Sequence, residues 1–182
     1  MLAGLCHDLA KPYTTKIESG RIKAREHEAT GVAITERFLD RLKLFTLDNY
    51  DARMQTLALV ELHAVPHQWF KTPEAITDGM FRRLALRAEL DLLYRVARAD
   101  CLGRKGDFKP EAEEWFIARA RSLGVEERPP KPLLMGRHVL ELGLQPGPQI
   151  GGVTRAVYEM QLDGEITTLD EAIEAARKII HE

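Results

Sequence analysis

Two adjacent residues near the start of the chain, His7 and Asp8, are the first side chains whose types could bind a metal ion. A neutral imidazole nitrogen and a carboxylate oxygen both suit a divalent metal, and adjacent positions keep the two donors close together. Two donors do not complete a coordination shell. Three later residues of the same types, His27, His63 and Asp100, are therefore the candidates for the missing ligands.

This donor set favours a catalytic ion over a structural zinc site, because histidine and carboxylate donors without thiolates fit Mn, Ni, Fe, Mg or Zn. Such an ion makes hydroxide from a bound water and polarises a phosphoryl oxygen, which phosphoester hydrolysis requires. Lys11 and Arg25 lie nearby in the sequence and could stabilise phosphate charge. We therefore name Asp8, Lys11 and Arg25 as the candidate catalytic residues.

Each candidate, taken alone, also has a plain structural reading as a surface or hydrogen-bonded group. The adjacent pair is different, because burying an imidazole and a carboxylate on an apolar turn without a metal or an ion pair is costly. His67 is either a further ligand or a solvated loop residue, since Pro66 breaks the helical register after His63. We expect His138 and His181 to be surface residues.

The five candidate ligands fall at or near the ends of predicted helices, where separate helices can direct side chains into a common cleft. The pattern predicts an all-α chain with one hairpin around Ser19-Gly20. Prolines 12 and 66 are expected to end the helices before them. The predicted segments are a helix end over 2–9, a hairpin over 13–23, helices over about 28–44 and 49–63, a loop over 65–78, a helical region over 81–100 with a break near 90, and helices over 110–123, 136–142, 149–162 and 169–180.

Length and composition indicate one well-buried domain with a small appendage in a chain of 182 residues. A formal net charge of −2 argues against a strongly basic nucleic-acid binder.

Cys6 and Cys101 are too few for a disulfide framework and are expected to be reduced. No apolar run approaches the roughly 18 residues of a membrane span, so we expect a cytoplasmic protein without membrane contact. The Pro-rich run 128–132 predicts a linker between regions 1–127 and 128–182.

Two other features leave alternatives open. Arginine and lysine are in excess over residues 79–109, where they could face phosphates or pair with neighbouring Glu and Asp. The sequence Pro146-Gly147-Pro148 precedes a predicted helix, whose free N–H groups could contact an RNA phosphate or simply begin the helix.

Several motifs in order resemble the HD superfamily of metal-dependent phosphohydrolases, and within it the HD region of bacterial tRNA nucleotidyltransferases, the CCA-adding and poly(A) polymerase group. They are Cys6-His7-Asp8-Leu9-Ala10-Lys11-Pro12, Gly20-Arg21-Ile22, His27-Glu28-Ala29-Thr30-Gly31-Val32, Ala97-Arg98-Ala99-Asp100, and a tail with Gly136-Arg137-His138-Val139-Leu140 and Gln161-Leu162-Asp163-Gly164. The motifs are weak singly and specific together, and they cover nearly the whole chain.

The resemblance implies a helical metal site with His7 and Asp8 as central ligands and Asp100 as the distal carboxylate. It implies that His27 and His63 bind a second ion or face phosphate. The sequence departs from the superfamily pattern in two ways. The superfamily's first histidine comes from a helix upstream of the His-Asp pair, which these 182 residues do not supply. In addition, Ala10 occupies a position where a glycine is usual. We therefore expect a fragment or an internal start.

Two functions follow as expectations. The first is a divalent-metal-dependent phosphohydrolase acting on a nucleotide or RNA-end phosphoester, such as a 2′,3′-cyclic phosphate. The second is a non-catalytic body and tail of a tRNA nucleotidyltransferase, serving tRNA binding or homodimer formation. The resemblance also implies that this chain does not add nucleotides, since it carries no catalytic nucleotidyltransferase head.

Overall fold

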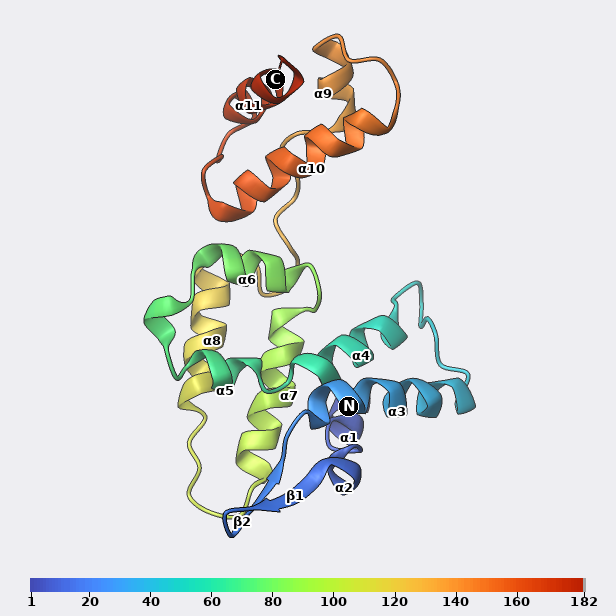
Figure 1. Cartoon of the computed structure of the whole chain (residues 1–182), viewed down its shortest axis with the longest axis vertical. Helices are drawn as coiled ribbons and strands as arrows, with labels where there is room; N and C mark the ends of the chain where they lie inside the picture. Colours follow the sequence, from blue (N-terminus) through green and yellow to red (C-terminus); the bar gives the residue numbers. More distant parts are fainter. Residues whose placement is uncertain (182) are drawn as a thin grey trace. The chain divides into compact units, whose positions relative to one another are not determined.

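The computed structural model describes residues 1–181, and in it the chain divides into two compact units. The first unit comprises Met1–Ile76 and Leu84–Arg128, and the second comprises Thr77–Arg83 and the chain from Pro129 onward. The second unit thus combines the chain from the Pro-rich run onward with a short segment from the middle of the chain. Figure 1 shows the path of the chain and the element labels used below.

The expected all-α architecture with a single hairpin is confirmed (Figure 1). Among the described residues, no helix combines the length and apolar character needed to cross a membrane. The elements of the first unit are α1 Leu2–Cys6, α2 Lys11–Thr14, β1 Thr15–Glu18, β2 Arg21–Ala24, α3 His27–Arg41, α4 Ala52–Leu62, α5 Val65–Trp69, the 3₁₀ turn η1 Pro73–Ala75, α7 Leu90–Gly103 and α8 Glu111–Ser122, while α6 Asp78–Ala85 crosses the division between the units.

The hairpin forms where the sequence predicts it. Strands β1 and β2 pair antiparallel with Ile17 opposite Ile22, and Ser19 and Gly20 occupy the turn. Both turn residues have positive φ, 51° for Ser19 and 72° for Gly20. That conformation matches the right-handed twist of the flanking strands and explains the glycine.

The helices before Pro12 and Pro66 end as expected, α1 at Cys6 and α4 at Leu62. Each proline also lies in the first turn of a short new helix, α2 and α5 respectively. A proline is tolerated there because the first N–H groups of a helix have no internal partner. The predicted loop over 65–78 consequently contains α5 and η1, which is a correction to the sequence reading.

Helices α3 and α4 pack against each other, and α1 packs against α4 and α7. Gly31 lies at this packing, where an added Cβ would stand 3.2 Å from Val60 Cγ1, so the missing side chain allows a close approach. Leu39, Val60 and Leu93 are fully buried in the same unit. The four helices are thereby held together at the ends that carry the candidate ligands.

The second unit has its own core, formed by α9 Gly136–Glu141, α10 Pro148–Asp163 and α11 Leu169–His181. Thr168 begins α11 as expected: its Oγ1 accepts from the Glu171 N–H, and the Glu171 carboxylate accepts from the Thr168 N–H. The Tyr158 hydroxyl donates to the Pro130 carbonyl, which fixes the Pro-rich run against α10. The buried residues of this core are Leu134, Val139, Val153, Val157, Ile166, Ala172 and Ala176.

Candidate metal centre

The first donor group joins the start of the chain to the end of α7. His7 is the C-terminal cap residue of α1, Asp8 follows it in the next turn, and Asp100 lies in the last turn of α7. His7 Nε2 is 3.4 Å from Asp8 Oδ2 and 3.5 Å from Asp100 Oδ1. The sequence separates His7 from Asp100 by most of the first unit, so the packing of α1 against α7 creates this contact.

The second donor group shares Asp8 with the first. His27 is the first residue of α3 and His63 caps the end of α4. His27 Nε2 is 3.6 Å from Asp8 Oδ1, and the His63 ring packs edge-on against the rings of His7 and His27, with centroids 5.1 and 5.3 Å apart. Within this second group, the potential metal-binding atoms of Asp8, His27 and His63 all lie within 4.8 Å of one another. The same holds for the atoms of His7, Asp8 and Asp100 in the first group.

The three histidines have the same orientation relative to the backbone. Each Nδ1 donates to the carbonyl oxygen three residues earlier: His7 to Gly4 at 2.9 Å, His27 to Ala24 at 2.8 Å, and His63 to Val60 at 2.7 Å. A carbonyl accepts only, so this contact places a ring proton on Nδ1, and in the neutral form of each ring the lone pair is on Nε2. A backbone carbonyl bound to the far nitrogen is the usual support of a metal-ligating histidine.

The Asp8 carboxylate is only half satisfied by the protein. Its Oδ2 accepts from the Lys11 ammonium at 2.6 Å, while its Oδ1 is buried and has no hydrogen-bond partner. A buried polar atom without a partner costs about 1–3 kcal/mol, and the cost is larger for a charged group. This unpartnered oxygen is 3.6 Å from His27 Nε2 in the second donor group, where a cation would satisfy it.

The local electrostatics suit cation binding. Burial lowers the pKa of the His63 imidazole, so this ring is neutral near pH 7 and can act as a ligand. Asp100 raises the pKa of His7. In turn the hydrogen bond from His7, with a further contribution from Arg104, holds the pKa of Asp100 well below its ordinary value of 3.8, so that this carboxylate is ionised.

The residues fit a divalent ion on two counts. Two ligands bound to one ion at about 2.1 Å lie roughly 3.0–3.5 Å apart, close to the 3.4–3.6 Å separations between the paired donors. Imidazole nitrogen and carboxylate oxygen are also the donors that Mn, Fe, Ni and Zn accept together. His7, Asp8 and Asp100 would hold one ion, and Asp8, His27 and His63 would hold a second.

The remaining candidates lie elsewhere or serve other partners. Arg25 pairs with Glu18 of the hairpin at 3.2 Å, and its side chain is 70% exposed. His67 is exposed on α5 and belongs to neither donor group. In the 79–109 stretch Arg87, Arg95 and Arg98 each pair with a nearby carboxylate, which favours the structural reading of that basic excess.

Sequence reasoning missed Arg104 as part of the site. Its guanidinium pairs with Asp100 Oδ2 from the next turn of the chain. The four-residue spacing between Asp100 and Arg104 was the available signal, because such pairs meet on one helix face. The three carbonyl acceptors carry no sequence signal, since every residue type supplies one.

The amino-acid sequence of this chain is similar to those of known proteins. The family model described as HD domain matches residues 1–105. The chain is 35% identical over 180 residues to an A-adding tRNA nucleotidyltransferase of Deinococcus radiodurans, covering 93% of this chain and 39% of that relative. It is 34% identical over 179 residues to a CC-adding tRNA nucleotidyltransferase of Thermus thermophilus, covering 94% and 38%.

The chain thus spans well under half the length of these curated relatives. No solved structure matches it. The HD match covers more than half of the 182 residues and includes His7, Asp8, His27, His63 and Asp100. The chain therefore belongs to the HD domain family.

Proposed function

We propose that the chain is a divalent-metal-dependent phosphohydrolase acting on a phosphoester of a nucleotide or an RNA end, such as a 2′,3′-cyclic phosphate. One observation carries the proposal: two donor groups share Asp8, whose buried Oδ1 has no partner, and three histidines aim Nε2 toward them. An ion bound there would activate water and polarise a phosphoryl oxygen.

The protein's own groups have distinct roles in this proposal. The cation would be held and oriented by the five candidate ligands, His7, Asp8, His27, His63 and Asp100. Nδ1 of each histidine is fixed by a backbone carbonyl. Lys11 lies beside Asp8 with its side chain 41% exposed, so its ammonium can also face a phosphate oxygen. Arg25 is turned toward Glu18, and its contribution would be a longer-range positive potential.

The proposed reaction is a hydrolysis and needs no other reactant than water. Water adds to phosphorus, and one P–O ester bond of the ring breaks. The released ribose oxygen takes a proton, which leaves a phosphomonoester and a free hydroxyl. Solvent supplies this proton, and the Lys11 ammonium stabilises the phosphate charge without transferring a proton.

The test is hydrolysis by the purified chain, stripped with EDTA and then supplied with Mn²⁺, Ni²⁺ or Mg²⁺. The substrates are bis(p-nitrophenyl) phosphate and a 2′,3′-cyclic nucleotide. We expect metal-dependent turnover that Asp8→Asn removes and that the matched variant His67→Gln retains, since His67 is exposed and outside the donor groups. Absence of turnover with every metal would overturn the proposal.

A second candidate function rests on the comparisons. Two relatives are named for action on tRNA, and the match to each includes the second unit as well as the HD region. On this reading the chain binds tRNA or forms an oligomer without catalysis. Binding of tRNA by a protein that holds no metal and hydrolyses nothing would favour it.

A further inference from the structure

Two hollows in the first unit share the side chain of Tyr13, and we propose that together they bind a single-stranded RNA end. We call them the Tyr13 surface: a hollow on the hairpin and a groove along α3, which meet at this residue. Tyr13 lies in α2 and is 76% exposed. The inference rests on the proposed function, because it makes an RNA end, not a free nucleotide, the substrate of the neighbouring Asp8 centre.

The hairpin hollow has a volume of about 320 Å³ and is lined largely by charged side chains. Lys16 and Lys23 lie directly opposite each other in the strand register, an arrangement that is unfavourable for like charges. Glu18 is shared by two cations, Lys23 at 3.3 Å and Arg25 at 3.2 Å. The hairpin therefore holds more cationic charge than it neutralises, which favours an anionic ligand.

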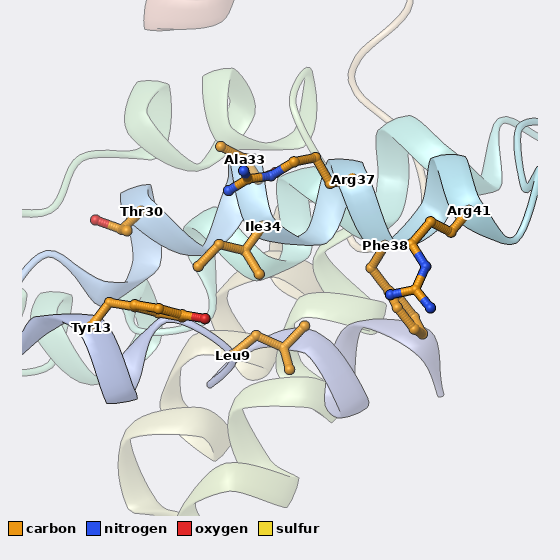
Figure 2. Close-up of a pocket in the computed structure, with 8 residues that line it drawn as sticks. All are labelled: Leu9, Tyr13, Thr30, Ala33, Ile34, Arg37, Phe38 and Arg41. Carbon is orange, nitrogen blue, oxygen red and sulfur yellow. The ribbon is translucent and has the colours of Figure 1, made fainter.

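The groove is larger, about 750 Å³, and combines apolar walls with a cationic edge. Figure 2 shows Ile34 pointing from α3 toward Leu9 and Tyr13, with Arg41 beside Phe38 and the Arg37 guanidinium lying along α3 next to Ala33. Neither arginine has an acidic partner within residues 1–181; the Arg37 Nε donates only to the Ala33 carbonyl of its own helix. These two guanidinium groups are thus available for phosphate.

The charge of the Tyr13 surface contrasts with that of the whole protein. Five cations line it, Lys16, Lys23, Arg25, Arg37 and Arg41, against the two carboxylates of Glu18 and Glu26, an excess of three positive charges. The whole chain has a formal net charge of −2. Positive charge is therefore concentrated here in a protein that is otherwise acidic, and a polyanion would be drawn to this face.

The combination of groups selects single-stranded nucleic acid among polyanions. Aromatic and apolar surface accommodates unstacked bases while flanking cations follow the phosphates. A duplex keeps its bases stacked inside and would not use the groove. Each hollow has the volume of a small-molecule site, so the pair exceeds what one nucleotide fills.

The surface adjoins the metal centre through the chain itself. Leu9, which lines the groove, follows Asp8 directly, and Lys11 between Leu9 and Tyr13 bonds to the Asp8 carboxylate at 2.6 Å. A strand held by Tyr13 would consequently place its terminal phosphate near residues that contact the centre.

The experiment measures binding of a fluorescein-labelled single-stranded RNA of about ten nucleotides by anisotropy, with EDTA present so that no hydrolysis occurs. Tyr13→Ala is expected to weaken binding roughly tenfold through a lost base contact. The double variants Lys16→Gln/Lys23→Gln and Arg37→Gln/Arg41→Gln should each lower the salt dependence, by about 0.7 in log–log slope per lost phosphate contact. Lys71→Gln/Lys109→Gln removes the same charge from exposed positions elsewhere in the unit and is the matched control.

The inference is overturned if the three surface variants bind as the control does, or if duplex RNA binds as tightly as the single strand. Its failure is distinguishable from failure of the proposed function, because binding is measured without metal and Asp8→Asn should retain it. An RNA bound through Tyr13 by a protein without hydrolase activity would reject the proposed function and retain this surface.

Discussion

Asp8 in the first unit and Asp163 in the second are carboxylates in opposite states of satisfaction. Both Asp163 oxygens accept from the Arg83 guanidinium at 2.7 Å, and Arg83 also donates to Glu159 at 2.9 Å. Asp8 has Lys11 on one oxygen and no partner on the other, which is buried. A complete ion-pair network stabilises packing, whereas an incomplete one retains capacity for a ligand.

Histidines show the same contrast. His138 in the second unit uses Nδ1 to accept from the Met135 N–H, which completes the start of α9. His7, His27 and His63 instead use Nδ1 as a donor to the backbone. Nε2 of His7 and of His27 lies near carboxylates, and the His63 ring packs edge-on against the other two rings. The orientation of the ring, and not the presence of histidine, separates a structural residue from a candidate ligand.

Asp8→Asn should have the largest effect on metal binding. The amide keeps the shape of the side chain but removes the charge shared by both donor groups, so affinity for Mn²⁺ should fall at least about 100-fold. Calorimetric titration of the EDTA-stripped protein measures this. Thermal stability without metal should be unchanged or higher, because the charged group with the buried, unpartnered Oδ1 is replaced by a neutral amide. Unaltered Mn²⁺ affinity would mean that Asp8 is not a ligand.

The two donor groups can be separated by changing a residue that belongs to one of them. His63→Gln and Asp100→Asn should each reduce the bound metal from about two ions to about one, with roughly 10–100-fold weaker binding at the altered group. Metal content after dialysis reports the stoichiometry. Loss of all metal in either variant would show a single site and not two.

For the hydrogen-bonded side chains of the second unit, we expect substitutions to change stability and not metal binding. Thr168→Ala removes the hydroxyl that caps α11 and should lower the free energy of unfolding by about 1 kcal/mol. Urea denaturation measures the change, and metal binding by the first unit should be unaffected. An altered metal affinity in this variant would contradict the independence of the two sets of contacts.

Arg83→Gln should have the smallest effect, because its ion pairs are solvent-exposed. Arg83 holds the pKa of Asp163 below its ordinary value of 3.8. The pairing thus contributes stability above pH 3.8, which is lost as pH falls through the lowered pKa of the folded state. The melting temperatures of wild type and variant should differ slightly at pH 7 and converge in acid; a constant difference across this range would refute the pairing.

Much of the fold was predictable because the signals are local. Ser19-Gly20 between β-branched residues specifies the hairpin, and Thr168 with Glu171 specifies the start of α11. The helices before Pro12 and Pro66 end as predicted, but the short helices that begin at these prolines were not predicted, since either a loop or a new helix can follow. Local sequence does not distinguish these two outcomes.

The candidate site was predictable in its residue types and not in its contacts. The positions of His7, His27 and His63 at helix ends allowed convergence, but which atoms meet depends on how α1, α3, α4 and α7 pack. Arg25 illustrates the limit: it is near Asp8 in the sequence, yet it pairs with Glu18 because the hairpin offers a closer carboxylate.

Anomalous X-ray scattering from a crystal soaked in Mn²⁺ tests the central claim most directly, because it locates the ion independently of activity. We expect one anomalous peak between Asp8, His7 and Asp100 and a second between Asp8, His27 and His63. The Lys11 ammonium would either move away from Asp8 Oδ2 or share this oxygen with the ion. Density confined to surface carboxylates, with Asp8 Oδ1 still unpartnered, would contradict it.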